Sequence, residues 1–318
     1  MSKPRIHPAK WAPPGPVAKL PTSNLPQLNI VPVPGSGPED ALWVGDDLVT
    51  GLEDGRIVKV SQDGWQIEVL ADTQGRPLGI EAHPDGLLIC DAEKGLLLLR
   101  DGVLTTLIAK GEHGLRVCNN AAVAADGTIY FTDSSQNFDL EFWTADILEH
   151  SGTGRLLRRS PEGAVDVLAQ GLQFANGVAL TPEFVAVAQT GLYCIDRVWL
   201  VNGRHEPWIT NLPAFPDNIA AGDDGLVWVT MASARKPALD KTAGAPALRK
   251  LIWALPEAFH PKPDTLVWIR AYDTDGRMVH EFFGEHEQFY MCTGVRAVGG
   301  RVAMGSLNTT ALAWFDLP

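Results

Sequence analysis

One pattern recurs along this chain at intervals of roughly 40 residues: an alternating apolar strand, a tight turn and a second apolar strand. Asp-Gly or Gly-Gly occupies several of the turns, because such hairpins need residues that tolerate positive φ. The pattern occurs in segments 41–60, 80–99, 121–135, 178–195, 219–232 and 295–315. Repeats of this length with four short strands each are typical of propeller blades. We therefore predict an all-β fold, a six-bladed β-propeller with four-stranded blades.

Two of the intervals between repeats are longer and contain insertions. Residues 136–150 are expected to form a short helix, and 233–263 form the second insertion; neither is long enough for a domain. The Pro-rich residues 1–34 are expected to form an extended arm, with Trp11 packed on the body. Residues 35–318 are then a single propeller domain, with short helical insertions placed where a lid could lie.

Charge and composition exclude several classes of partner. The net charge of −12 argues against nucleic acid, which requires a basic face. There is no membrane-length apolar run and no secretory signal, so we expect a cytoplasmic protein without a membrane partner, acting on a small molecule. The four cysteines form no CxxC pair and are expected to be buried free thiols. The oligomeric state stays open.

The repeat also brings polar residues into one phase. Eight residues before the aligned turn positions Asp47, Gly86, Gly127, Phe184, Gly225 and Gly300 stand Glu39, Leu78, Asn119, Asn176, Asp217 and Cys292. Equivalent positions of successive blades lie at the same end of the innermost strands, so their side chains should converge on the central channel. Four of the six carry oxygen donors, two carboxylates and two amides, within segments that are otherwise apolar.

Each of these residues has a local explanation when taken alone. Asn176 precedes a glycine and could shape a turn, and Asp217 could accept a local hydrogen bond. Together, however, they form an oxygen-rich cage of charge −2 with no Lys or Arg in phase to pair with it. We therefore predict one bound divalent metal ion held by Glu39, Asn119, Asn176 and Asp217. Such a cage suits calcium (Ca2+) first, with Zn2+, Mn2+ and Mg2+ as alternatives.

Further residues are candidates for substrate chemistry. Asp217 is the first choice to orient or deprotonate water, and His113, shortly before Asn119, is a further candidate base. Arg296 is a candidate to bind a substrate carboxylate or oxyanion. Asn120 and Asn218, which each directly follow a predicted metal ligand, are expected to contact substrate. His113 and Arg296 are also compatible with an exposed loop histidine and a surface arginine.

Several motifs carry a resemblance to a known family. They are GPEDAL, TGLEDGRI, GRPLGIEAHPDGLLICDAEKGLL, DGTIYFTDSS, TGRLLR, FANGVAL, FPDNIA and MGSLNTTALAWFDL. From about residue 35 onward the chain resembles the strictosidine-synthase-like branch of the gluconolactonase and regucalcin superfamily, which is also similar to paraoxonases and diisopropylfluorophosphatase. The resemblance implies a six-bladed propeller with one catalytic divalent metal, usually calcium, and its ligands map onto the same four residues.

Two departures from the family pattern narrow the expected activity. An Asn-Asp pair is usual after the first metal amide, whereas this chain has Asn119-Asn120. The plant Pictet–Spengler enzymes use a glutamate near the last blade, but TGVRAVGG (293–300) contains no acid. We therefore expect a metal-dependent hydrolase of a lactone or ester. A metal-assisted lyase or condensation, a phosphotriesterase and a non-enzymatic binding propeller are the alternatives.

Overall fold

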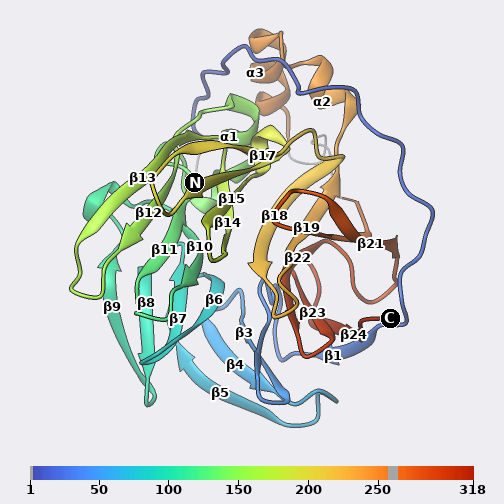
Figure 1. Cartoon of the computed structure of the whole chain (residues 1–318). Helices are drawn as coiled ribbons and strands as arrows, with labels where there is room; N and C mark the ends of the chain where they lie inside the picture. Colours follow the sequence, from blue (N-terminus) through green and yellow to red (C-terminus); the bar gives the residue numbers. More distant parts are fainter. Residues whose placement is uncertain (1–2, 257–263) are drawn as a thin grey trace.

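Six antiparallel sheets of four strands each are arranged around a central channel in the computed structural model, which describes residues 3–256 and 264–318 (Figure 1). This confirms the predicted six-bladed β-propeller. The first three blades are β2 (Leu42–Val44), β3 (Asp47–Gly51), β4 (Arg56–Val60) and β5 (Ile67–Asp72); β6 (Pro77–His83), β7 (Gly86–Asp91), β8 (Gly95–Arg100) and β9 (Val103–Ala109); and β10 (Cys118–Val123), β11 (Ile129–Asp133), β12 (Gly154–Arg159) and β13 (Val165–Leu172).

The remaining blades follow in chain order, and the last one includes a strand from the N-terminal region. They are β14 (Ala175–Leu180), β15 (Phe184–Gln189), β16 (Cys194–Trp199) and β17 (His205–Ile209); β18 (Ala214–Ala221), β19 (Val227–Ala234), β20 (Leu266–Tyr272) and β21 (Met278–Glu285); and β22 (Cys292–Val298), β23 (Arg301–Ser306), β24 (Ala311–Asp316) and β1 (Asn29–Pro32).

Strand β1 closes the ring by pairing with β24, with Asn29 opposite Trp314 and Pro32 opposite Ala311. This pairing of the two ends of the chain completes the sixth four-stranded blade. Because β1 lies inside the range assigned to the arm, the arm proper ends before residue 29 and the propeller begins with β1.

The hydrophobic core is divided into wedges between neighbouring blades. Trp268 and Tyr193, for example, belong to the cluster between the fourth and fifth blades, and Trp43 to the cluster between the last and first. Alternating strand residues supply these clusters, because successive side chains point to opposite faces of each blade. All four cysteines are buried and free, as expected. The blades therefore pack face to face and leave polar groups at the channel.

The two insertions form helices that pack on each other. The first contains a 3-10 turn, η2 (Leu140–Phe142), and α1 (Trp143–Glu149); the second contains α2 (Pro237–Lys241) and α3 (Pro246–Ala254). Residues 257–263 of the second insertion lie outside the described residues. Ile6 of the arm, Phe138, Leu148 and Trp253 form a buried cluster that joins these parts. We call α1, α2, α3 and residues 3–11 of the arm the cap.

The arm follows the cap before it reaches the propeller. In Figure 1 it passes α3 and α2 and then descends to β1. Its backbone is bonded to both insertions: Ala9 N–H donates to Glu149 O at 2.9 Å, and Trp11 N–H donates to Ala243 O at 3.3 Å. Trp11 stacks on His150, with ring centroids 4.1 Å apart. No helix among the described residues is long and apolar enough to cross a membrane.

Candidate metal centre

A break in the register of the inner strands creates the candidate site. In β10 the pairing with β11 shifts between Cys118 and Ala121, so Asn119 and Asn120 have no regular ladder partner. The same shift spans residues 175–178 in β14, 216–219 in β18, 77–80 in β6 and 292–295 in β22. Such bulges re-aim side chains and are common beside functional sites. Each therefore releases two consecutive residues at the same end of the channel.

The shift corrects one equivalence predicted from the repeat. In the other shifted strands the residue eight before the turn is the first of the two released residues, as with Asn119. In the last blade Cys292 still pairs with Ser306, so Thr293 is the equivalent residue. The hairpin there closes through Gly299 and Gly300, between the paired Val298 and Arg301. An alignment of the repeats on Gly300 is therefore displaced by one residue in the last blade.

The four predicted ligands, which we call the ligand ring, line this end of the channel. Asn119, Asn176 and Asp217 are the first released residues of β10, β14 and β18, and Glu39 directly precedes the first blade. Glu39, Asn119 and Asn176 are only 5%, 2% and 3% exposed. The Asp217 carboxylate lies near the Asn176 amide, and Glu39 is close enough to repel that carboxylate.

Both ligand amides have a buried oxygen without a partner. Asn119 Nδ2 donates to Ser134 Oγ at 2.9 Å, and Asn176 Nδ2 donates to Thr190 Oγ1 at 3.1 Å. Within the described part of the chain, the Oδ1 atoms of Asn119 and Asn176 have no hydrogen-bond partner. An unsatisfied buried carbonyl oxygen costs free energy comparable to that of a lost hydrogen bond. These two oxygens therefore fit a bound hard cation.

The pKa shifts of the two carboxylates also favour a bound cation. Burial raises the pKa of Glu39 to about 7, although Arg76 lowers it and Asp40 raises it further. Arg76 Nη2 lies 3.5 Å from Glu39 Oε2. Burial, followed by repulsion from Glu39, raises the pKa of Asp217 well above its ordinary value. A divalent cation between the two carboxylates would offset both effects.

The donor set also restricts the kind of metal. Within residues 3–256 and 264–318, no group of three or more His, Cys, Asp and Glu side chains could hold an ion. A site at the ligand ring must therefore use the two amides as well as the two carboxylates. An all-oxygen set of this kind suits calcium or another hard cation better than zinc, which favours nitrogen and sulfur ligands.

The residues that follow the ligands have different surroundings. We call Asp40, Asn120 and Asn218 the adjacent ring. Asn120 Oδ1 accepts a hydrogen bond from Val178 N–H at 2.9 Å, and Asp40 Oδ2 accepts from Ile80 N–H at 3.1 Å. Each thus ties its blade to the next one. The hydrogen bond to Val178 accounts for the position of Asn120, and its substrate role stays a prediction.

Asn218 and Arg296 are also buried. Asn218 is 0% exposed, and neither of its side-chain polar atoms has a hydrogen-bond partner in residues 3–256 and 264–318. Its substrate role stays a prediction. Arg296 Nη2 lies 3.0 Å from Asp40 Oδ2, 2.9 Å from Ile80 O and 3.3 Å from Glu81 Oε2. This network occupies the guanidinium within the protein, so Arg296 is neither a surface arginine nor free to bind substrate in this structure.

His113 lies in the 3-10 turn η1 (Glu112–Gly114), before the strand that carries Asn119. It is exposed and has a φ of 51°, and its carbonyl accepts a hydrogen bond from Arg155 Nη1 at 3.0 Å. No hydrogen bond joins its ring to the ligand ring among the described residues. The structure thus gives the predicted base role of His113 no support, and Asp217 is the better candidate.

The cap lies at the same end of the propeller as the ligand ring. The first insertion leaves β11 after Asp133, which pairs with Cys118, the neighbour of Asn119. The second leaves β19 after Ala234, which pairs with Ala214 at the start of the Asp217 strand. A series of aromatic rings connects the cap to that strand. The ring centroids of Trp11 and Tyr193 are 6.1 Å apart, and those of Tyr193 and Phe215 are 5.0 Å apart.

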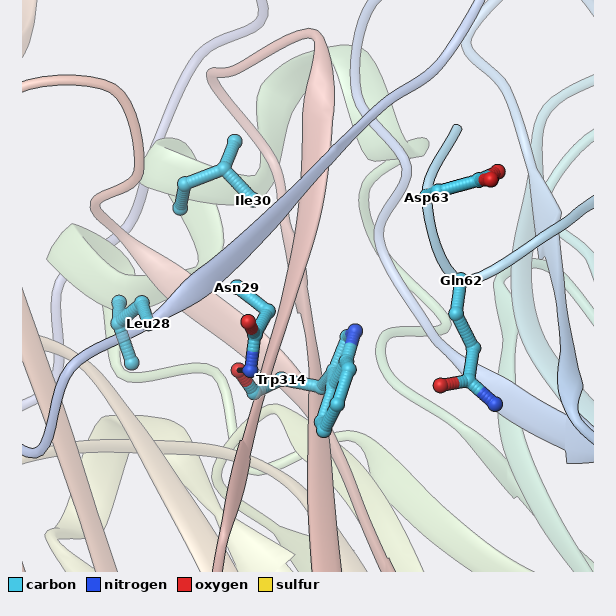
Figure 2. A pocket seen from close by; sticks show the side chains of 6 residues that line it. All are labelled: Leu28, Asn29, Ile30, Gln62, Asp63 and Trp314. Atoms are coloured by element: carbon cyan, nitrogen blue, oxygen red, sulfur yellow. Dashed lines mark hydrogen bonds between the residues drawn. The ribbon is translucent and has the colours of Figure 1, made fainter. Parts of the chain in front are cut away.

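Figure 2 shows a different hollow, a shallow depression of about 570 Å³ on the outside of the propeller. Its described lining comes from β1 and the adjoining Leu28, from Trp314 of β24, and from Gln62 and Asp63 of the first blade. None of these is a predicted site residue. Because β1 is the outermost strand of its blade, this depression is separate from the ligand ring.

Three residues of the site were not identified from the sequence. Arg76 precedes β6 within the GRPLGI motif, and Ser134 and Thr190 lie 15 and 14 residues after the amides that they bind. The similar spacing of Ser134 and Thr190 from Asn119 and Asn176 is the one signal that could have revealed them.

Comparisons with known proteins agree with this architecture. The family model described as strictosidine synthase matches residues 119–203, the segment from the first ligand amide past the second. Among solved structures, a gluconolactonase from Xanthomonas campestris superimposes with a TM-score of 0.66 at 17% identity, covering 98% of this chain and 100% of that one. The calcium-binding protein regucalcin from Agrobacterium tumefaciens superimposes with a TM-score of 0.63 at 14% identity, covering 92% and 95%. These structural likenesses show the fold.

Relatives at higher identity define the family. Mouse adipocyte plasma membrane-associated protein is 36% identical over 251 residues, which are 69% of this chain and 60% of that protein. The Arabidopsis thaliana protein STRICTOSIDINE SYNTHASE-LIKE 6 is 32% identical over 296 residues, which cover 89% of this chain and 79% of the plant protein. This chain therefore belongs to the strictosidine synthase-like family of β-propellers.

Proposed function

We propose that the protein is a metal-dependent hydrolase that opens a small lactone or ester. The observation that carries the proposal is the pair of buried Oδ1 atoms of Asn119 and Asn176, which have no hydrogen-bond partner among the described residues, at the same register shift as Asp217, whose carboxylate Glu39 is close enough to repel. The calcium-binding description of the Agrobacterium neighbour and the gluconolactonase description of the Xanthomonas neighbour are in keeping with it.

In this proposal the ligand ring holds one divalent cation, with calcium as the first choice. When bound, such an ion supplies Lewis-acid polarisation of a carbonyl oxygen and stabilises the negative charge that develops there. Asn119 and Asn176 contribute neutral oxygens, so that the four ligands carry a charge of −2 rather than −4. Arg76 lies beside Glu39 and favours its ionised form.

Asp217 is the residue that we assign to proton transfer. Its carboxylate lies near the Asn176 side chain and the Asn218 backbone N–H, which both favour its ionised form. It is partly exposed, unlike Glu39, Asn119 and Asn176. In the hydrolysis, Asp217 accepts the proton of the attacking water at a carboxylate oxygen as the water oxygen bonds to the carbonyl carbon, and it returns that proton to the leaving alkoxide oxygen as the acyl C–O bond breaks.

The last blade favours hydrolysis over condensation. Residues 293–300 contain no carboxylate that could act as the base of a condensing enzyme, and Arg296 in this segment is bound to Asp40 and Glu81. Leu78 occupies the ligand position of the second blade and packs with Ala92 and Val117. It gives the ring one apolar side, suited to the carbon skeleton of a small lactone or ester.

The test is a panel of sugar lactones, alkyl lactones and aryl esters, run with chelator-treated protein and after restoring Ca2+, Mg2+, Mn2+ or Zn2+. We expect turnover of at least one class that disappears on chelation and returns with calcium. Turnover that chelation leaves unchanged would contradict the metal-dependent mechanism. Turnover of none of the three classes would contradict the hydrolase assignment.

A further inference from the structure

Two buried hydroxyl groups connect the ligand ring across three blades. Ser134 Oγ accepts a hydrogen bond from Asn119 Nδ2. It also donates to Ala175 O at 2.7 Å, and this carbonyl directly precedes Asn176. Likewise, Thr190 Oγ1 accepts a hydrogen bond from Asn176 Nδ2. It donates to Pro216 O at 2.7 Å, the carbonyl directly before Asp217. The same contact pattern thus leads from the third blade to the fourth and from the fourth to the fifth.

The chemistry of these contacts determines which way each amide faces. A backbone carbonyl can only accept, so the single hydroxyl hydrogen of Ser134 must point to Ala175 O. Its oxygen can then only accept from Asn119, and the Asn119 atom that touches it must be Nδ2. The same reasoning applies to Thr190 between Pro216 and Asn176. The network therefore fixes an orientation that electron density alone rarely distinguishes.

The consequence is that both amide oxygens are left free on the side away from the hydroxyls. If either amide rotated by half a turn, its oxygen would face a hydroxyl that has no hydrogen to donate, and its NH2 group would face the cation site. Ser134 and Thr190 are 0% and 6% exposed, so water cannot readily replace them. The hydroxyls thus prevent a conformation in which the ring would repel a cation.

We propose that Ser134 and Thr190 are positioning residues that preorganise the ligand ring for a hard divalent cation. They lock Asn119 and Asn176 with oxygen inward, and they tie each amide to the residue preceding the next ligand. This inference rests on the proposed function only in that it requires the ring to bind a cation. It does not require any particular substrate.

The experiment compares Ser134→Ala and Thr190→Val, which remove a hydroxyl with little change in shape, with wild type. Calcium affinity is measured by calorimetry on chelator-treated full-length protein, and the melting temperature is measured without metal. Outer partners of metal ligands typically contribute 10- to 100-fold to affinity, so we expect each variant to bind calcium about 10- to 100-fold more weakly. Thr190→Ser, which retains the hydroxyl, should restore affinity to near the wild-type value.

Thr230 offers a matched control. Its Oγ1 is equally buried and bridges neighbouring blades, donating to Thr293 O at 2.6 Å, but it contacts no ligand side chain. Thr230→Val should lower the melting temperature to a similar extent while leaving calcium affinity nearly unchanged. A merely structural role for Thr190 would instead make Thr190→Val and Thr230→Val alike in both measurements.

The possible outcomes separate the inference from the proposed function. If wild type binds calcium and Thr190→Val and Ser134→Ala bind it equally tightly, the positioning role is overturned while the metal site survives. If wild type binds no divalent cation, both the inference and the metal-dependent mechanism are overturned. If the affinities fall as expected but no substrate is hydrolysed, the inference is supported and the hydrolase assignment fails.

Discussion

The ligand ring and the adjacent ring carry the same kinds of side chain, one residue apart, in opposite surroundings. Asn119 presents an amide oxygen with no partner, whereas the oxygen of Asn120 accepts the Val178 N–H. Glu39 has one cation, Arg76, at 3.5 Å, whereas Asp40 has Arg296 at 3.0 Å together with the backbone N–H groups of Ile80 and Ala41. In these two pairs the first side chain is left for a ligand and the second joins the blades, whereas the Asn218 side chain has no hydrogen-bond partner among the described residues.

The difference shows that residue type does not decide between binding and structure at these positions. For Asn119 and Asn120 the bulge decides it, because it turns the first released residue toward the channel and the second toward the next blade. Glycines in the alternate blades complete the arrangement. A Cβ on Gly177 would lie 2.6 Å from the Asn218 Cα, and one on Gly294 would lie 2.8 Å from Asp40 Oδ1. The adjacent ring can pack only against these glycines.

The largest expected effect is on the ligand ring. Asp217→Asn removes a ligand charge and the proposed proton acceptor, so kcat/KM should fall by about 10³-fold or more, and calcium affinity should fall with it. The metal-free variant should melt no lower than wild type, because one of two mutually repelling carboxylates is gone. Initial rates, calorimetry and thermal melting check this.

Asp223→Asn is the control for Asp217→Asn. It makes the same charge change in the same blade, at the exposed turn that follows β18. It should keep wild-type rates and affinity. Full activity in Asp217→Asn would remove both the ligand and the base assignment.

A large loss of stability is expected in the adjacent ring. Arg296→Met leaves Asp40 and Glu81 buried without their cation and should lower the free energy of unfolding by about 3–5 kcal/mol. Urea titration in excess chelator measures this. Arg158→Met, which breaks an exposed pair with Asp166, should cost less than about 1 kcal/mol. Equal losses in the two variants would contradict the structural role assigned to Arg296.

Acid should weaken the cap independently of either ring. Burial, followed by the charge of Arg249, lowers the pKa of His150 from 6.5 to about 4. The unfolded chain therefore binds the His150 proton first, and the contribution of His150 to stability should fall by roughly 3 kcal/mol as the pH drops from above 6.5 to about 4. Urea titrations across this range, with and without calcium, measure the slope.

The residue that replaces His150 must tolerate a positive φ. His150 has a φ of 56°, so His150→Asn is chosen because asparagine tolerates this conformation. It should reduce the pH slope between 4 and 6.5 while lowering stability at neutral pH through the lost stacking on Trp11. A slope identical to that of wild type would show that groups other than His150 cause the acid sensitivity.

The sharpest test of the contrast between neighbours is the pair Asn119→Ala and Asn120→Ala. Asn120→Ala orphans the Val178 N–H and should lower the free energy of unfolding by about 1–3 kcal/mol, with calcium affinity largely kept. Asn119→Ala should lose calcium affinity with a smaller change in stability. Calorimetry measures the loss of calcium affinity in both variants, and urea titration measures the loss of stability. If Asn120→Ala lost the affinity and Asn119→Ala lost the stability, the roles assigned to the two rings would be wrong.

Much of this arrangement follows from the sequence alone. The repeat predicts the six blades, and its phase selects Glu39, Asn119, Asn176 and Asp217 because equivalent positions of a propeller must meet at the channel.

The rest depends on features that have no sequence period. The register shift that replaces Cys292 with Thr293 arises from the length of one hairpin. Arg296 could not be separated from a surface arginine, because its partners Asp40 and Glu81 come from other blades. The contribution of the arm to the cap depends on packing between segments distant along the chain.

The central claim is that the ligand ring binds one divalent cation, and calcium titration of chelator-treated protein tests it most directly. Calorimetry, supported by elemental analysis of the loaded protein, should give one calcium per chain, with binding strongly weakened in Asp217→Asn and kept in Asp223→Asn. Absence of bound calcium, magnesium, manganese and zinc in wild type, or equal binding by Asp217→Asn and wild type, would contradict it.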